Sequence, residues 1–119
     1  MYNATVLELF QNARNQGNLA DADLTGQEGI SGQGPFLVMT IKIEGERIAE
    51  ARFETYGCPA AVACGSWVTI WVTGKTREQA SILEADDLLK ILGGLPLGKE
   101  HCASLAVHAL KDAITQWQS

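Results

Sequence analysis

The sequence has no cluster of basic residues: its nine Lys and Arg residues are scattered among 14 Asp and Glu residues, and the formal net charge is −5. Because phosphate backbones and anionic lipids are bound by basic patches, we expect neither nucleic acid nor a membrane among the partners. A charge-free stretch at 56–74 contains Gly, Pro, Ser and Thr. It falls short of the roughly 20 apolar residues of a membrane span, so we interpret it as a buried loop and helix.

The sequence also lacks the features of a secretory signal, because Glu8 and the polar residues after Phe10 interrupt any apolar segment at its start. We therefore expect a cytoplasmic, reducing location. The cysteines are few and odd in number, Cys58, Cys64 and Cys102, and none forms a CxxC pair. In a reducing compartment such a set is more naturally read as thiols or metal ligands than as a disulfide framework.

The chain shows no internal repeat and no linker. With 46% apolar and 19% charged residues it has the composition of an ordinary globular protein. Its length suits one domain, residues 1–119, which can bury a single core.

The first half of the sequence predicts a helix, a loop and a hairpin. Apolar residues at helical spacing over 6–13 indicate a short helix that ends before Gly17, and the Gly-, Asp- and Gln-rich stretch 18–35 predicts a long loop. Alternation over 37–43 predicts a strand, and Glu44-Gly45 supplies a tight turn. The returning strand is expected to place Ala49, Ala51 and Phe53 on its apolar face and Glu50, Arg52 and Glu54 on its wet face.

The second half predicts helices. Residues 60–72 are apolar on nearly all sides, which is typical of a buried helix, and Gly74 should end it. Thr76 and Gln79 form a capping-box pattern, and 81–92 predicts a further short helix that Gly93-Gly94 stops. The last helix has the clearest periodicity, through Cys102, Leu105, Ala106, Ala109, Leu110, Ala113, Ile114 and Trp117. Strands early and helices late predict an α+β domain, with helices on one face of a small antiparallel sheet of about three strands.

Four residues could carry chemistry together: Cys58, Cys64, His101 and Cys102. Thiolate and imidazole are ligands of zinc and of iron–sulfur clusters, and a closed zinc site needs four. Cys102 opens the last helix, where the helix dipole should stabilise a thiolate that binds metal or accepts a sulfane sulfur. The alternative, which spacing alone leaves open, is that the cysteines are small buried apolar residues.

The residues around these positions resemble the IscU/NifU-type iron–sulfur scaffold family. The similarity rests on the stretches 53–58 (Phe-Glu-Thr-Tyr-Gly-Cys), 71–75 (Trp-Val-Thr-Gly-Lys) and 95–102 (Leu-Pro-Leu-Gly-Lys-Glu-His-Cys), and it extends over nearly the whole chain. The pairing of a Gly-Cys before an apolar helix with a Lys-x-His-Cys at the start of the last helix is highly specific.

The resemblance implies a non-enzymatic scaffold with an α+β fold of the IscU/NifU N-terminal (SufE/NifU) type. Three loops would bring the ligands to one exposed end, where a [2Fe–2S] cluster is assembled and handed to client apo-proteins, and where zinc often binds when no cluster is present. Cys58 and Cys102 match the second and third family cysteines, and His101 matches the histidine beside the third. Cys102 would accept sulfur from a cysteine desulfurase.

The sequence departs from the family in two places. Where the family has Cys-Gly-Asp before the first hairpin strand, this chain has Gln33-Gly34-Pro35. The family uses that aspartate as a labile ligand, so we expect slower cluster release here. The chaperone-recognition stretch Leu-Pro-Pro-Val-Lys is altered at residues 95–99, so the resemblance does not imply recruitment of the dedicated Hsp70 system. Cys64 stands where the family usually has serine, and we hypothesise that it replaces the missing ligand; a buried core residue is the alternative.

Two other readings remain open. The chain could be a degenerate homologue that acts as a zinc-bound or metal-free interaction module, or a thiol redox protein that uses Cys58 and Cys64, although Pro59 and the missing CxxC spacing disfavour the latter. His108 is interpreted as solvated, and the tryptophans Trp67, Trp71 and Trp117 as core or interface residues. Oligomerisation through an apolar surface is also possible.

Overall fold

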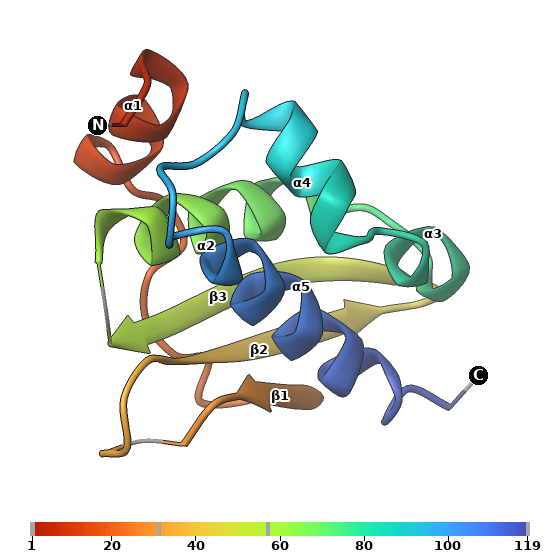
Figure 1. Cartoon of the computed structure of the whole chain (residues 1–119). Coiled ribbons are helices and arrows are strands. Elements are labelled where there is room, and N and C mark those ends of the chain that lie inside the picture. The colour runs from red at the N-terminus through yellow and green to blue at the C-terminus, as the bar shows by residue number, and fades with distance from the viewer. Residues whose placement is uncertain (1, 31, 57, 119) are drawn as a thin grey trace.

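The computed structural model describes residues 2–30, 32–56 and 58–118. Its elements in chain order are α1 (Ala4–Gln11), β1 (Leu24–Glu28), β2 (Phe36–Glu44), β3 (Arg47–Tyr56), α2 (Pro59–Val72), α3 (Arg77–Ser81), α4 (Ala85–Ile91) and α5 (His101–Ile114). The strands form one antiparallel sheet in the order β1-β2-β3. The predicted α+β architecture is confirmed (Figure 1).

The loop predicted over 18–35 is wrong in its middle, because 24–28 form strand β1. β1 pairs with β2 from Leu24 opposite Ile41 to Glu28 opposite Leu37. Gly26, which reads as a loop signal, is required by packing: a Cβ there would overlap the carbonyl oxygen of Ala109 on α5. A close approach of helix to strand therefore explains a glycine that sequence alone assigns to a loop.

The predicted apolar face of the returning strand is wrong at one residue. The β2–β3 register shifts between Lys42 and Ile43, so that Ile43 faces Ile48 while Lys42 faces Glu50. Ala49 is the extra residue of this bulge. Consequently Ile48 is buried and Ala49 is exposed, whereas Ala51 and Phe53 point into the core as expected.

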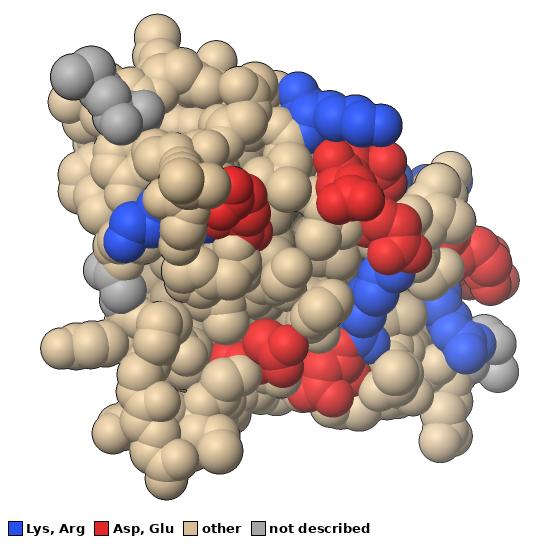
Figure 2. Space-filling view, in the orientation of Figure 1, with Lys and Arg blue, Asp and Glu red and all other residues tan. Residues whose placement is uncertain are grey.

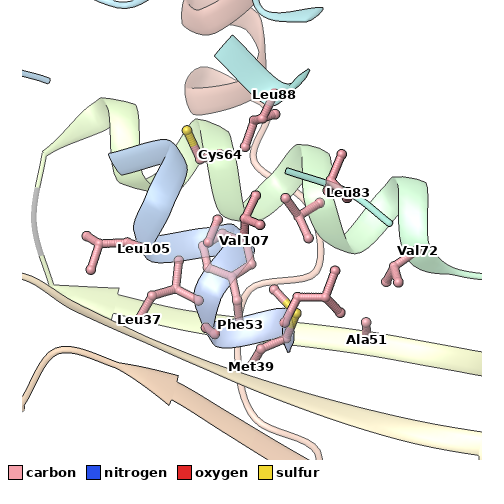
Figure 3. Close-up of a cluster of buried hydrophobic side chains, with 14 of the residues drawn as sticks. Leu37, Met39, Ala51, Phe53, Cys64, Val72, Leu83, Leu88, Leu105 and Val107 are labelled. Atoms are coloured by element: carbon pink, nitrogen blue, oxygen red, sulfur yellow. The ribbon is translucent and has the colours of Figure 1, made fainter. Parts of the chain in front are cut away.

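Helices α2 and α5 cover one face of the sheet, α2 over β3 and α5 over β1 and β2 (Figure 1). α1 packs on α2, and α3 and α4 pack on α5. The core between them is drawn in Figure 3, where Leu37, Met39 and Phe53 of the sheet face the helices. The contact between α2 and β3 is close, because a Cβ on Gly65 would overlap the Phe53 ring.

The segment between α1 and β1 crosses the other face of the sheet. It pairs with the edge of β3 at Phe53, whose N–H donates to Asn15 and whose carbonyl accepts from Gly17. Further on, the N–H of Leu19 donates to the hydroxyl of Thr40, a buried residue on this second face. The crossing carries the chain from one edge of the sheet to the other.

The helix boundaries follow their capping signals. The capping box of Thr76 and Gln79 opens α3 as predicted, with both hydrogen bonds present. The helix predicted over 81–92 starts later than expected, because Ser81 ends α3 and a second box, Glu84 with Asp87, opens α4. Within the described residues, no helix has the length and apolar content to cross a membrane.

Candidate functional site

The site lies where helices α2 and α5 begin. Cys58 is the N-cap residue of α2 and follows strand β3, and Cys102 is the second residue of α5. Because the two helices contact each other on the same face of the sheet, residues 44 positions apart in the chain come together. The Sγ atoms of Cys58 and Cys102 are 3.6 Å apart. Gly57, part of the motif that predicted the site, lies outside the described residues.

His101 adds an imidazole to this thiol pair. Its Nε2 atom lies 3.7 Å from the Sγ of Cys102. The histidine is exposed, Cys58 is half-buried, and Cys102 is only 1% exposed. The site therefore opens to solvent on the side of Cys58 and His101 and closes behind Cys102.

These two spacings match those of ligands on one tetrahedral metal ion. With Zn–S bonds of about 2.3 Å and Zn–N bonds of about 2.0 Å, two thiolates on one ion lie about 3.8 Å apart, and a thiolate and an imidazole nitrogen about 3.5 Å apart. The observed separations are 3.6 Å for Cys58 with Cys102 and 3.7 Å for Cys102 with His101. Soft thiolates with an imidazole are also the donor types suited to zinc and iron–sulfur clusters.

The ligand set is nevertheless open. Over residues 2–30, 32–56 and 58–118, no three His, Cys, Asp or Glu side chains form a group that could hold a metal ion. Two ligand pairs share Cys102, and they are not closed into a site with three or four converging donors. The described side chains thus form two donor pairs that share Cys102, and a role for them as metal ligands stays a prediction.

In the described part of the chain, the sulfur of Cys64, the fourth predicted ligand, is not within hydrogen-bonding distance of the other two sulfurs. It is fully buried on α2, within the cluster of side chains that includes Leu88 and Val107 (Figure 3). Burial and the neighbouring Cys102 and Cys58 raise the pKa of the Cys64 thiol. Its role as a ligand stays a prediction.

The two thiols of the pair differ in acidity. Burial alone would raise the pKa of Cys58, but the backbone N–H groups of Ala61 and Ala60, the hydrogen bond from Cys102 and the charge of Lys99 together hold that pKa below its ordinary value. Burial, followed by the hydrogen bond to Cys58 and the charge of Cys58, raises the pKa of Cys102 to about 12. The expectation of a thiolate at Cys102 is therefore wrong for the metal-free protein: the first thiolate forms at Cys58.

The N-termini that carry the cysteines have no capping side chain. Cys58 makes no side-chain hydrogen bond to the first turn of α2, and Glu100, the N-cap residue of α5, makes none to α5. The Glu100 carboxylate instead accepts from the N–H of Gly98. The first-turn N–H groups of Ala61, Cys102 and Ala103 donate instead to the backbone carbonyls of Cys58, Lys99 and Glu100.

Sequence reasoning missed Tyr2. Burial, then the charge of Cys58 and a hydrogen bond with it, raises the pKa of the tyrosine hydroxyl, and Cys102 and Ala60 also act on it. This places the hydroxyl beside the thiol pair. No sequence pattern could have revealed it, because the neighbourhood depends on how α1 docks against α2. The charge of Lys99 acts to lower the pKa of both thiols, although burial and Cys58 outweigh it at Cys102.

The remaining candidates lie outside the pair. Gln33 and Pro35 are exposed in the β1–β2 connection. His108 is exposed, as predicted, with its Nδ1 atom 3.0 Å from a carboxylate oxygen of Glu28. Of the three tryptophans, Trp117 is buried in the core, and the half-buried Trp67 and Trp71 rings stack with centroids 5.9 Å apart.

Comparison with known proteins settles the family. The model of the NifU-like N terminal domain matches residues 1–119. The chain belongs to this NifU-like family. Among relatives of the NifU-like chain, an iron–sulfur cluster assembly scaffold protein IscU from Archaeoglobus fulgidus is 41% identical over 117 residues, covering 98% of this chain and 76% of the relative. The iron–sulfur cluster assembly enzyme IscU from Drosophila melanogaster is 37% identical over 122 residues, covering 99% and 79%.

Solved structures show the same NifU-like fold. The N-terminal part of a nitrogen-fixing NifU-like protein from Brucella abortus superposes with a TM-score of 0.73 at 20% identity, over 96% of this chain and 92% of that one. The resemblance found in the sequence is thereby confirmed. The relatives' names describe iron–sulfur cluster assembly, most often as scaffolds and once as an enzyme.

Proposed function

We propose that this chain is a scaffold on which an iron–sulfur cluster, a [2Fe–2S] cluster in the simplest case, is assembled and from which it passes to client apo-proteins. The observation that carries the proposal is the pair of spacings, Cys58 to Cys102 and Cys102 to His101, each of which suits two ligands of one tetrahedral metal ion. The cluster is cargo, and zinc is the expected occupant of the same ligands when no cluster is present.

In this proposal a cysteine desulfurase supplies the sulfur, and Cys102 accepts it. Sulfur delivered there arrives beside Cys58 and His101, within the ligand group itself. The chain then acts by binding and release and needs no catalytic turnover of its own, which is the sense in which we expect it not to be an enzyme. A reducing cytoplasm, which keeps the thiols free, is the compartment that suits such chemistry.

The open ligand set supports a role in transfer. A cluster held by few protein donors exposes its remaining positions to ligands of a client. The thiol end also carries few charges, as the left part of the face in Figure 2 shows, and it exposes Tyr56 and Leu97, which are 71% and 97% accessible. Apolar side chains beside a reactive group are suited to contact with partner proteins.

A second candidate function is a zinc-bound or metal-free interaction module. It is favoured by the absence of a converging group of three ligands in the described residues and by Gln33 and Pro35 at the family's Cys and Asp positions. It shares the apolar thiol end with the first candidate but needs no iron or sulfide.

A transfer experiment separates the two functions. The chain is loaded anaerobically with iron and sulfide, freed of excess reagents and mixed with an apo-ferredoxin, and the ferredoxin spectrum is followed. The scaffold proposal predicts complete transfer, at a slower rate than from a family member that has the Cys-Gly-Asp sequence, because the labile aspartate is absent. Failure of the chain to take up iron and sulfide would favour the interaction module, and a loaded chain that gives up no cluster would contradict the transfer step.

A further inference from the structure

The Cys58–Cys102 pair has the geometry for a second reaction. Its sulfur atoms are in contact at 3.6 Å, and both thiols are free. A disulfide has an S–S bond of about 2.0 Å, so closing the bond needs an approach of roughly 1.5 Å. Both residues lie at the start of a helix, and rotation of the two side chains about the Cα–Cβ bond can supply this approach.

Accessibility gives the pair a direction. Cys58 is half-buried and reachable from solvent, whereas Cys102 is 1% exposed and Cys64 is fully buried. A small oxidant therefore meets Cys58 first. Cys102 lies directly behind it and is the thiol placed to attack a modified Cys58. Cys64 shares no sulfur contact with Cys58 in the described residues, so it takes no part.

We propose that Cys58 and Cys102 form a site of thiol–disulfide exchange with small disulfides such as oxidised glutathione. In the first step the Cys58 sulfur attacks one sulfur of oxidised glutathione, which forms a mixed disulfide and releases one reduced glutathione with the proton of Cys58. In the second step the Cys102 sulfur attacks the Cys58 sulfur and releases the second glutathione with the proton of Cys102. The two protein thiols are oxidised by two electrons, and one glutathione disulfide is reduced to two thiols.

The consequence for the site rests on the proposed function. Both sulfurs of the pair are proposed ligands of the cargo, and the thiolate is the form that binds metal. The disulfide removes both ligands at once, so oxidation switches cargo binding off and reduction restores it. A bound metal ion, conversely, occupies both sulfurs and shields them from the oxidant. The redox pair differs from the Cys58–Cys64 pair considered from sequence.

The test treats metal-free protein with oxidised glutathione under native, anaerobic conditions, quenches with acid and counts free thiols after unfolding. We expect the count to fall from three to one, with no glutathione retained, and peptide mapping to find Cys58 joined to Cys102. The matched controls are single substitutions. Cys64→Ser should lose both remaining thiols, Cys102→Ser should stop with glutathione on Cys58, and Cys58→Ser should react about tenfold more slowly because the other thiols are buried. Circular dichroism checks that each variant is folded.

Three results would overturn the proposal: a disulfide that includes Cys64, a disulfide between two copies of the chain, or a stable glutathione adduct on the unsubstituted protein. The link to cargo is tested with zinc alone. The oxidised protein should not bind zinc and should regain binding after reduction; zinc binding by fully oxidised protein would refute the switch. Because the disulfide assay contains no metal, it can succeed where cluster assembly fails, which keeps failure of this proposal distinct from failure of the proposed function.

Discussion

The helix N-termini of this protein fall into two groups. α1, α3 and α4 begin with a hydrogen bond between a side chain and the backbone: the Asn3 and Thr76 side chains accept from the first turns of α1 and α3, and in α4 the Asp87 carboxylate accepts from the N–H of Glu84. α2 and α5, whose first turns carry the site, have no such bond. Capping residues stabilise a helix by about 1 kcal/mol. The protein thus forgoes this stabilisation at the two ends where its thiols gather.

Backbone conformation does not explain the difference. Cys58 has φ −90° and ψ 171°, close to the −80° and 171° of Thr76, so a serine or threonine at position 58 could cap α2. The missing cap of α2 is therefore due to the side chain of residue 58 alone. A cysteine at this position does not cap the helix, and the N–H groups of Ala60 and Ala61 lower the pKa of its thiol. The helix therefore lacks the stabilisation of an N-cap, and the Cys58 thiol has a lowered pKa.

Among substitutions that test this comparison, Cys58→Ser is expected to have the largest effect. We expect zinc binding to be lost, because the exposed member of the thiol pair is gone, while the free energy of unfolding rises by up to about 1 kcal/mol, because serine can cap α2. Zinc competition with a chromophoric chelator and urea unfolding of the metal-free protein measure the two effects. A variant that is less stable and still binds zinc would show that the comparison is mistaken.

The next effect concerns the reactivity of the two thiols. Cys58 has the lower pKa and the greater exposure, whereas burial and Cys58 raise the pKa of Cys102 to about 12. At neutral pH, iodoacetamide should therefore modify Cys58 at least about tenfold faster than Cys102 in metal-free protein. Mass spectrometry of timed samples reads the order. Faster labelling of Cys102 would reverse the assignment of the thiolate.

A capped helix supplies the opposite case. Thr76→Ala removes the side-chain half of the capping box of α3 and should lower the free energy of unfolding by about 1 kcal/mol. Zinc affinity should not change, because α3 lies at the end of α2 away from the thiols (Figure 1). Urea unfolding and the same zinc competition apply. An altered zinc affinity would indicate that the two ends of the molecule are coupled.

The smallest change is expected from Cys64→Ala. The variant keeps an apolar side chain in the core, and the structure places the Cys64 sulfur away from contact with the other two. Zinc content, measured by elemental analysis, should stay unchanged, with stability slightly lower from the lost packing. A loss of zinc comparable with that of Cys58→Ser would instead support the hypothesis that Cys64 is the replacement ligand.

Much of this was predictable from local patterns. The hairpin, the Thr76 box and the amphipathic last helix each have a sequence signal that tertiary contacts only reinforce. Strand β1 was missed because Gly26 serves contact with Ala109, and Ala49 was misplaced because a bulge depends on the pairing of two strands. At the site, the residue types and motif predicted that Cys58, His101 and Cys102 lie together, and the structure brings them together, whereas their role as ligands stays a prediction.

Which thiol of the Cys58–Cys102 pair loses its proton first could not be predicted from the sequence. The helix N-terminus favoured a thiolate at Cys102, but burial and the neighbouring Cys58 raise the pKa of that thiol. Tyr2 likewise joins the site through the docking of α1 and not through a motif. Both facts depend on which side chains are packed together, and sequence periodicity does not specify that.

We propose that a cluster is built on the Cys58–Cys102 pair despite Gln33 and Pro35. The most direct measurement is iron and acid-labile sulfide content, with a visible spectrum, after anaerobic incubation with iron, cysteine and a cysteine desulfurase. We expect iron and sulfide in equal amounts with cluster absorption, lost in Cys102→Ser and kept in Thr76→Ala. The absence of both acid-labile sulfide and cluster absorption from the unsubstituted protein, whether or not zinc is bound, would contradict this proposal.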